Sequence, residues 1–180
     1  FGCGYYAPNA DVTFTNCTSE GNSLYGFYAT NGGKLYNCVD KDVGAGKTDY
    51  TYRKPASYYS IPCRSTNPSL VMENCTSIDS HGYGLQVDLA SNVQIQNFHL
   101  ENPAGIDGKG ASLGGTNGQF GDSSVDITAS GDRVDTLVFA KNNQNVQYTG
   151  EITSDSARAF LVEGGQNVQT AGMKVVPAGQ

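Results

Sequence analysis

The stretch Ser69–Glu101, SLVMENCTSIDSHGYGLQVDLASNVQIQNFHLE, contains the pattern on which the fold depends. Three short apolar segments, Leu70–Met72, Gly84–Val87 and Val93–Ile95, alternate with polar corners rich in Asn, Asp, Ser and Gly. Runs of this length between such corners are typical of short β-strands. The stretch therefore predicts one complete turn of a coil and the beginning of the next.

The same pattern recurs along the chain. An Asn-Cys step ends at Cys17, Cys38 and Cys75, and an Asn-Phe step ends at Phe98, so the intervals are 21, 37 and 23 residues. The tripeptide Asn-Val-Gln begins at Asn92, Asn145 and Asn167. A period of about 22 residues indicates a solenoid, and the V-x-I alternation indicates strands rather than helices.

These observations predict an all-β chain, a right-handed parallel β-helix of about seven to eight rungs in one domain over residues 1–180. Successive rungs are expected to stack about 4.8 Å apart. The Asn amides of the Asn-Cys column should then bond along the coil axis, and the cysteines should fill a narrow apolar corner. Because the sequence has no initiator Met, we expect a fragment or the C-terminal part of a longer chain.

The rung N-C-T-S…H-G-Y-G-L-Q-V…S-N-V-Q-I-Q-N, residues 74–97, resembles the repeats of the pectate-lyase-like β-helix superfamily. In particular, it is similar to those of secreted alginate epimerases, polysaccharide lyases and phage tailspikes. The resemblance implies a secreted or virion-surface protein with a polysaccharide ligand. The Y-G-x-D-P-H type of catalytic motif found in the epimerases is absent, so the resemblance assigns no catalytic residue to this chain.

The charge of the chain is unevenly distributed. A net charge of −6 argues against general binding to nucleic acid or to a membrane surface. No run of about 18 apolar residues predicts a membrane-spanning helix. Residues 41–64 are nevertheless basic and rich in Tyr, with a net charge of +3, whereas the remainder carries −9. This segment is either a binding site for an acidic polymer or a solvated loop.

Two intervals exceed the period, and the excess residues are predicted to form two loops, Ala45–Ser65 and Ala104–Gly121. Both loops begin a few residues after the Asn-Cys column. They should therefore project from one corner, two rungs or about 10 Å apart. The rung between them carries His81 at that corner. The sequence thus predicts a groove between the loops with His81 on its floor.

The residues of this groove suggest a polyuronate lyase or a C5-epimerase. Tyrosine rings offer flat faces to sugars, and Arg and Lys pair with uronate carboxylates. In either reaction the carboxylate must be neutralised, and a base must remove the C5 proton. The candidate catalytic residues are His81, Arg53 and Tyr59. The candidate substrate-binding residues are Tyr50, Tyr52, Lys54, Tyr58 and Lys109.

Other interpretations remain open at the level of the sequence. A glycoside hydrolase needs two carboxylates, for which Asp79, Asp88 and Asp107 are candidates. A non-catalytic carbohydrate-binding or structural β-helix, such as an adhesin or a tailspike segment, is the alternative from another class. In that case a homotrimer or an upstream segment would cover the strand edge at the N-terminal end.

No cofactor is predicted. The cysteine spacing fits no zinc site, and Cys3 and Cys63, which lie outside the repeat, are candidates for a disulfide. A weak calcium-binding pattern comprises Asp122, Asp126 and Asp132.

Overall fold

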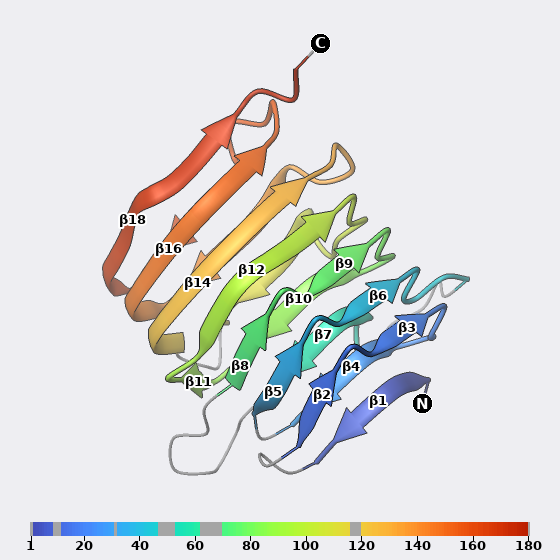
Figure 1. Cartoon of the computed structure of the whole chain (residues 1–180). Helices are drawn as coiled ribbons and strands as arrows, with labels where there is room; N and C mark the ends of the chain where they lie inside the picture. Colours follow the sequence, from blue (N-terminus) through green and yellow to red (C-terminus); the bar gives the residue numbers. More distant parts are fainter. Residues whose placement is uncertain are drawn as a thin grey trace.

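The computed structural model describes residues 2–8, 12–30, 32–46, 53–61, 70–115 and 120–179. Within them, all regular structure is β-strand, arranged as a parallel β-solenoid of about seven turns (Figure 1). The all-β coil predicted from the repeat is therefore confirmed. The described residues contain no helix, and therefore no helix long and apolar enough to cross a membrane.

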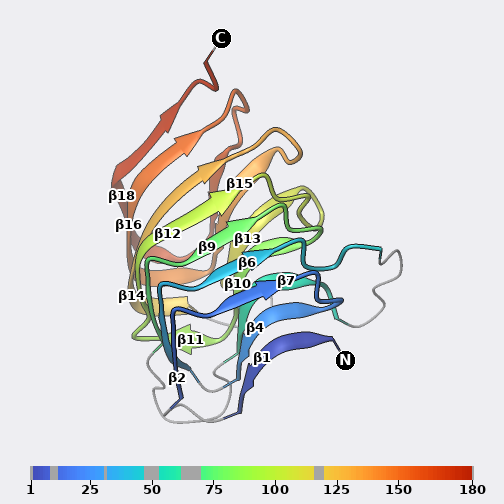
Figure 2. The same cartoon turned by 45° about the vertical axis from the view of Figure 1, so that its right-hand side comes forward.

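Each turn contributes one strand to a seven-stranded sheet, sheet A, in which all neighbouring strands are parallel. Figure 2 shows these strands stacked behind the second sheet. In their spatial order they are β1 (Cys3–Ala7), β4 (Tyr25–Ala29), β7 (Ala56–Ser60), β10 (Tyr83–Val87), β13 (Lys109–Leu113), β15 (Thr136–Lys141) and β17 (Phe160–Glu163).

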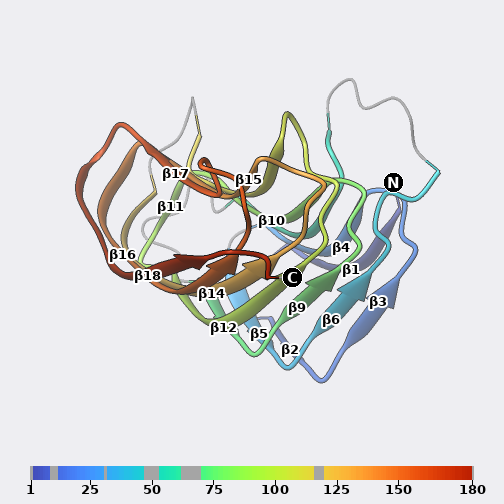
Figure 3. The same ribbon diagram turned by 90° about the horizontal axis from the view of Figure 1, so that it is seen from above.

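The remaining strands form sheet B, which is bent, so that the coil seen from above has a V-shaped side opposite sheet A (Figure 3). One limb contains β2 (Thr13–Thr15), β5 (Gly33–Tyr36) and β8 (Leu70–Glu73). The other contains β3 (Thr18–Glu20), β6 (Val39–Lys41) and β9 (Thr76–Ile78). Longer strands span both limbs in the later turns: β12 (Gln94–Glu101), β14 (Phe120–Ser130), β16 (Asn143–Thr153) and β18 (Gln166–Val176), with the short β11 (Ala90–Ser91) beside β14.

The interior of the coil consists of side chains that stack from turn to turn. Parallel in-register pairing places like positions directly above one another, and apolar side chains at these positions leave water together. The rings of Tyr5, Phe27 and Tyr58 form a continuous stack with centroid distances of 4.8 and 5.0 Å. Phe98 meets Tyr58 edge-on at 5.3 Å. These contacts make one core along the axis.

In four successive turns the bend of sheet B is made by asparagines in the left-handed conformation. Asn16, Asn37, Asn74 and Asn97 have φ values between 53° and 57°, a region that Asn tolerates better than most residues. The side-chain amides of the last three each donate to the amide oxygen of the preceding turn, with N–O distances of 3.1, 3.1 and 2.8 Å along the column. Next to this ladder Cys38 and Cys75 are fully buried. The predicted amide ladder and apolar cysteine corner are both confirmed.

The prediction of two loops is wrong in one respect, because each predicted loop contains a regular strand of sheet A. Strand β7 lies inside the predicted loop Ala45–Ser65, and β13 lies inside Ala104–Gly121. The extra residues instead lengthen the connections between strands, as at 42–55 and 102–108, which precede β7 and β13. The Tyr-rich and Gly-rich composition of these segments concealed strands with the same inward and outward alternation as their neighbours.

One carboxylate lies inside the coil. Asp40 occupies a column between Ser19 and Ser77, is fully buried, and has no hydrogen-bond partner for either carboxylate oxygen within the described residues. Burial raises the pKa of Asp40 to about 7, and the nearby hydroxyls of Ser57 and Ser19 offset only part of this shift. Gly26 is required above it, since a Cβ there would lie 2.2 Å from Asp40 Oδ1.

The amide ladder gives a first prediction. Asn74→Ala should destabilise the coil by about 2–4 kcal/mol, because it removes two amide bonds and places a Cβ-bearing residue without a polar side chain at positive φ. Asn74→Gly loses the same bonds but tolerates the conformation, so it should be less destabilising by about 1 kcal/mol. Denaturant unfolding measures both values, and equal losses would contradict a conformational role for this Asn.

The buried carboxyl gives a second. Because the pKa of Asp40 is higher in the folded than in the unfolded chain, its contribution to stability falls as pH rises from about 4 to about 7. Asp40→Asn removes this titration. The variant should therefore gain on the order of 2–4 kcal/mol relative to the wild type between those pH values. Unfolding curves at pH 4 and pH 8 test this, and a pH-independent difference would show that Asp40 does not titrate as expected.

Candidate functional site

The outer face of sheet A carries a row of aromatic and polar side chains. Tyr6, Tyr28, Tyr59 and Gln86 are register partners on successive strands and point away from the coil interior. The ring centroids are 5.3 Å apart for Tyr6–Tyr28 and 5.2 Å for Tyr28–Tyr59. Tyr25 packs against the same rings at 4.8 and 4.7 Å. The face is therefore an aromatic platform.

A hollow of about 380 Å³ lies on this platform. Its wall includes the exposed Arg53 and the half-exposed Lys54, both from the connection that precedes β7. In this hollow two cations meet several tyrosine rings. The lining residues are Tyr25, Tyr28, Arg53, Lys54, Tyr59, Ile61, Tyr83 and Gln86.

A second hollow, also of about 380 Å³, continues along the face towards the C-terminal turns. It shares Ile61, Tyr83 and Gln86 with the first, so the two form one trough along the coil. The second hollow adds charges of both signs, from Asp88, Lys109, Lys141 and Glu163. The Nζ of Lys109 lies 4.6 Å from the centre of the Phe139 ring, which holds the cation over an aromatic face.

Burial shifts the acid–base properties of the trough. Desolvation raises the pKa of Asp88 to about 6, although the amide of Gln86, 3.3 Å away, partly opposes the shift. Desolvation also raises the pKa of Tyr83 to about 12, assisted by the charges of Asp107 and Asp88. The pKa values of Tyr25 and Tyr59 rise for the same primary reason. At neutral pH these tyrosines are therefore hydroxyl donors, whereas Asp88 exchanges a proton near pH 6.

The backbone next to Asp88 is strained. Leu89 has a φ of 47°, which is rare for a residue with a large side chain, and it lines the second hollow while 42% exposed. Strained conformations of this kind cluster at ligand-binding and catalytic sites. The combination of a carboxyl with a raised pKa and a strained, exposed neighbour makes this end of the trough a candidate for chemistry.

Four of the predicted residues line the trough. Arg53, Lys54 and Tyr59 line the first hollow, and Lys109 lines the second. Lys54 also pairs with Asp107 at 3.3 Å, which joins the connections 42–55 and 102–108. Both side chains are largely exposed, so this ion pair is weak and leaves Lys54 able to bind another anion.

The prediction that Tyr58 binds substrate is wrong. Tyr58 is only 2% exposed, and its ring lies in the interior stack. Its hydroxyl is 2.8 and 2.9 Å from the carbonyl oxygens of Cys38 and Thr76. Since β7 is a strand, consecutive residues point to opposite faces, and only Tyr59 of this pair faces outward.

His81 lies at the predicted corner but not in the trough. Its backbone N–H donates to Val43, and the neighbouring Ser80 accepts from Ala104, so its turn does lie between the two long connections. The side chain is exposed and is not among the described residues that line either hollow. Tyr50 and Tyr52 lie outside the described residues, as does Cys63, so the roles predicted for them stay predictions.

The carboxylates proposed for a hydrolase or for calcium are mostly engaged elsewhere. Asp79 accepts from Asn102 at 2.8 Å, and Asp122 accepts from Asn145 at 3.1 Å. Asp126 accepts from the Thr149 hydroxyl and the Asn97 backbone. In the part of the chain that the structure describes, no three His, Cys, Asp or Glu side chains are grouped to hold a metal ion.

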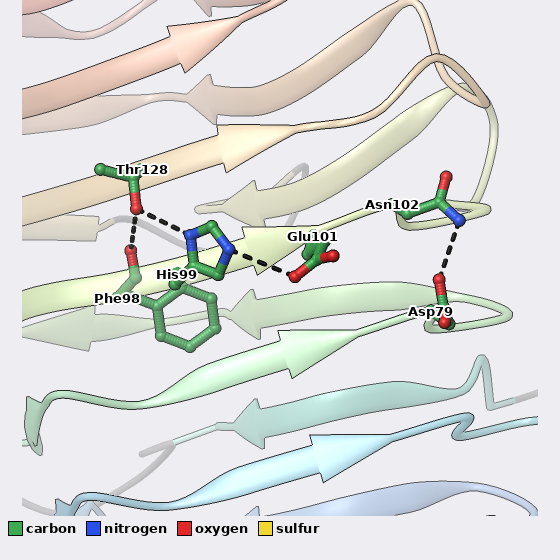
Figure 4. A network of polar contacts seen from close by, with 6 residues as sticks. All are labelled: Asp79, Phe98, His99, Glu101, Asn102 and Thr128. Carbon is green, nitrogen blue, oxygen red and sulfur yellow. Dashed lines mark hydrogen bonds and ion pairs between the residues drawn. The ribbon is translucent and has the colours of Figure 1, made fainter.

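A separate polar network lies on the outer face of sheet B (Figure 4). His99 Nε2 is 3.4 Å from Glu101, and its Nδ1 is 3.0 Å from the Thr128 hydroxyl. The hydroxyl of Thr128 also donates to the Phe98 carbonyl at 3.5 Å. This network ties β12 to β14.

The residues that the sequence did not reveal are Tyr25, Tyr28 and Gln86. The signal was present in the aligned segments YGFYA, ASYYS and YGLQV, at residues 25–29, 56–60 and 83–87. Their third residues point inward and their fourth residues point outward. Recognising ASYYS as a strand would have placed Tyr28, Tyr59 and Gln86 in one row.

Comparison with known proteins adds no family to this geometry. No family model, curated protein or solved structure matches the chain.

Because the pKa of Asp88 depends on Gln86, Gln86→Leu should raise the Asp88 titration midpoint above its value of about 6. The substitution removes the amide that stabilises the carboxylate and adds apolar surface beside it. Carboxyl carbon shifts followed by NMR between pH 3 and pH 9 measure the midpoint. Gln96→Leu, on the exposed face of β12, is the matched control and should leave it unchanged. A lower midpoint in Gln86→Leu would contradict the assignment.

Proposed function

We propose that this protein binds an acidic polysaccharide along the outer face of sheet A and acts on it as a polyuronate lyase or C5-epimerase. The observation that carries the proposal is the first hollow, where Arg53 and Lys54 meet the tyrosine platform on an otherwise acidic chain. The resemblance of residues 74–97 to pectate-lyase-like repeats supports the same class of ligand, and with it a secreted or virion-surface location.

The lining suits a uronate polymer in two ways. Tyrosine rings provide flat, partly apolar faces for sugar rings, and their hydroxyls remain protonated donors because their pKa values are raised. Arg53 presents a planar fork that matches a carboxylate, and Lys54 and Lys109 supply further positive charge along the trough. A neutral polymer has no carboxylate for these cations to bind.

The proposed reaction begins with neutralisation of the substrate carboxylate by Arg53, which makes the C5 proton more acidic. Asp88 takes that proton, a role suited to a carboxyl with a pKa near 6. In a lyase the C5–H electron pair forms the C4–C5 double bond, the C4–O bond breaks, and a tyrosine hydroxyl protonates the leaving oxygen. In an epimerase, a proton returns to C5 from the opposite side and no bond to oxygen breaks.

Binding is tested with Arg53→Gln. The variant should bind alginate or polygalacturonate at least tenfold more weakly, because it loses a charge-assisted contact. Calorimetry measures the affinity, and added salt should weaken wild-type binding. Arg158→Gln, an exposed Arg outside both hollows, is the control. Equal affinity of Arg53→Gln and wild type for both polymers would overturn the proposed site.

Catalysis is tested separately. A lyase produces unsaturated ends that absorb in the ultraviolet, and an epimerase changes the C5 configuration seen by NMR. Asp88→Asn should abolish either activity while retaining binding, whereas His81→Ala should retain both, since His81 lies outside the trough. Loss of turnover only in His81→Ala would move the chemistry to the corner, as the sequence alone predicted.

The second candidate is a non-catalytic carbohydrate-binding β-helix, either an adhesin or a tailspike segment. It is favoured by the shape of the trough, which is open along sheet A and contains charged groups spread over several turns. It predicts binding of the polymer without any product in either assay. A trimeric mass in solution would support the tailspike version.

A further inference from the structure

The repeated Asn-Val-Gln tripeptide builds a second polar surface, on sheet B, that the trough does not use. The triplet Asp122-Ser123-Ser124 occupies the equivalent position in the turn between the first two repeats. The first residue of each repeat and of this triplet lies at a corner in the left-handed conformation, with φ between 51° and 58°. Two amide bonds of 3.1 and 2.9 Å link these corners from Asp122 through Asn145 to Asn167. The corner residues are Asn92, Asp122, Asn145 and Asn167.

The third residue of each repeat forms a parallel exposed row. Gln94, Ser124, Gln147 and Gln169 are register partners on β12, β14, β16 and β18, which lie side by side in Figure 1. One turn breaks the pattern, because Ser124 replaces a Gln. Its short side chain leaves a notch between Gln94 and Gln147, which are two turns or roughly 10 Å apart. A hollow of about 340 Å³ lies at this notch.

The floor of the notch is fixed and its walls have free hydrogen-bonding capacity. The Ser123 hydroxyl donates to Gly121 at 2.6 Å and accepts from the Val93 N–H at 2.9 Å. The side-chain amides of Gln94 and Gln147 make no hydrogen bond to any described residue. Asp122 uses only Oδ1, for Asn145. A ligand would therefore meet unsatisfied donors and acceptors above a hydrogen-bonded floor.

The chemistry of the lining defines the ligand class. Among the described lining residues there is no aromatic ring and no cation, and the only charge is the Asp122 carboxylate. That carboxylate would repel a uronate and accept hydrogen bonds from hydroxyl groups, while the amides both donate and accept. We propose that the notch around Ser124 binds a neutral, hydroxyl-rich sugar residue of a glycan. This site is independent of the proposed activity on sheet A.

The decisive variant is Ser124→Gln, which restores the glutamine row and fills the notch with a side chain that the neighbouring turns already carry. The probes are oligosaccharides of glucose, mannose, galactose and xylose on an array, with uronic acid oligosaccharides beside them. The wild type should bind at least one neutral oligosaccharide. Calorimetry with that oligosaccharide should show at least a tenfold loss of affinity in Ser124→Gln.

Three further variants assign the result. Ser130→Gln introduces the same side chain at the other end of β14 and should change nothing. Ser124→Ala keeps the notch open and should bind within a few-fold of wild type. Arg53→Gln should lose uronate binding but keep neutral-sugar binding, which separates the two sites. Absence of neutral-sugar binding by the wild type, or unchanged affinity in a folded Ser124→Gln, would overturn the proposal.

Discussion

Four successive turns of the coil change direction at an asparagine held in the left-handed conformation, and side-chain amide bonds join these asparagines from one turn to the next. The column from Asn16 to Asn97 shows this over four turns. The backbone conformation alone would allow glycine, but glycine offers no side chain to join the turns. Asn supplies both the bend and the bond, so it fixes the register of the strands that follow.

Register then determines both the core and the surface. Each strand pairs in parallel with the equivalent strand of the next turn, so a side chain contacts the side chain at the equivalent position above or below it. Phe27 contacts Tyr58 inside the coil in this way, and Tyr28 contacts Tyr59 outside. Tyr58 and Tyr59 are adjacent in sequence, yet one stabilises the core and the other lines the trough. The trough is thus a consequence of the same stacking that makes the core, and its tyrosines need no dedicated loop to hold them.

The sequence was sufficient for the parts of the fold that repeat. The Asn-Cys column, the interval of about 22 residues and the strands after residue 120 follow from side-chain types that recur at fixed positions. It failed at β7 and β13, where lengthened connections shifted the interval and composition suggested loops. The grouping of Arg53, Lys54 and Lys109 around one trough was predictable from charge and aromatic content. The surface on which they lie required knowing which residue of each strand faces outward.

The position of His81 in the backbone follows from the repeat, but the surroundings of its side chain do not. Counting residues placed it correctly between two long connections, because backbone hydrogen bonds obey the repeat. A binding surface depends instead on which neighbouring side chains leave space, and that depends on size and direction. In this coil, hollows occur where large side chains frame smaller ones on a flat face, as at Gln86 beside Tyr59 or Ser124 between two glutamines. Single outward residues can therefore change the shape and charge of a hollow without disturbing the ladder that specifies the fold.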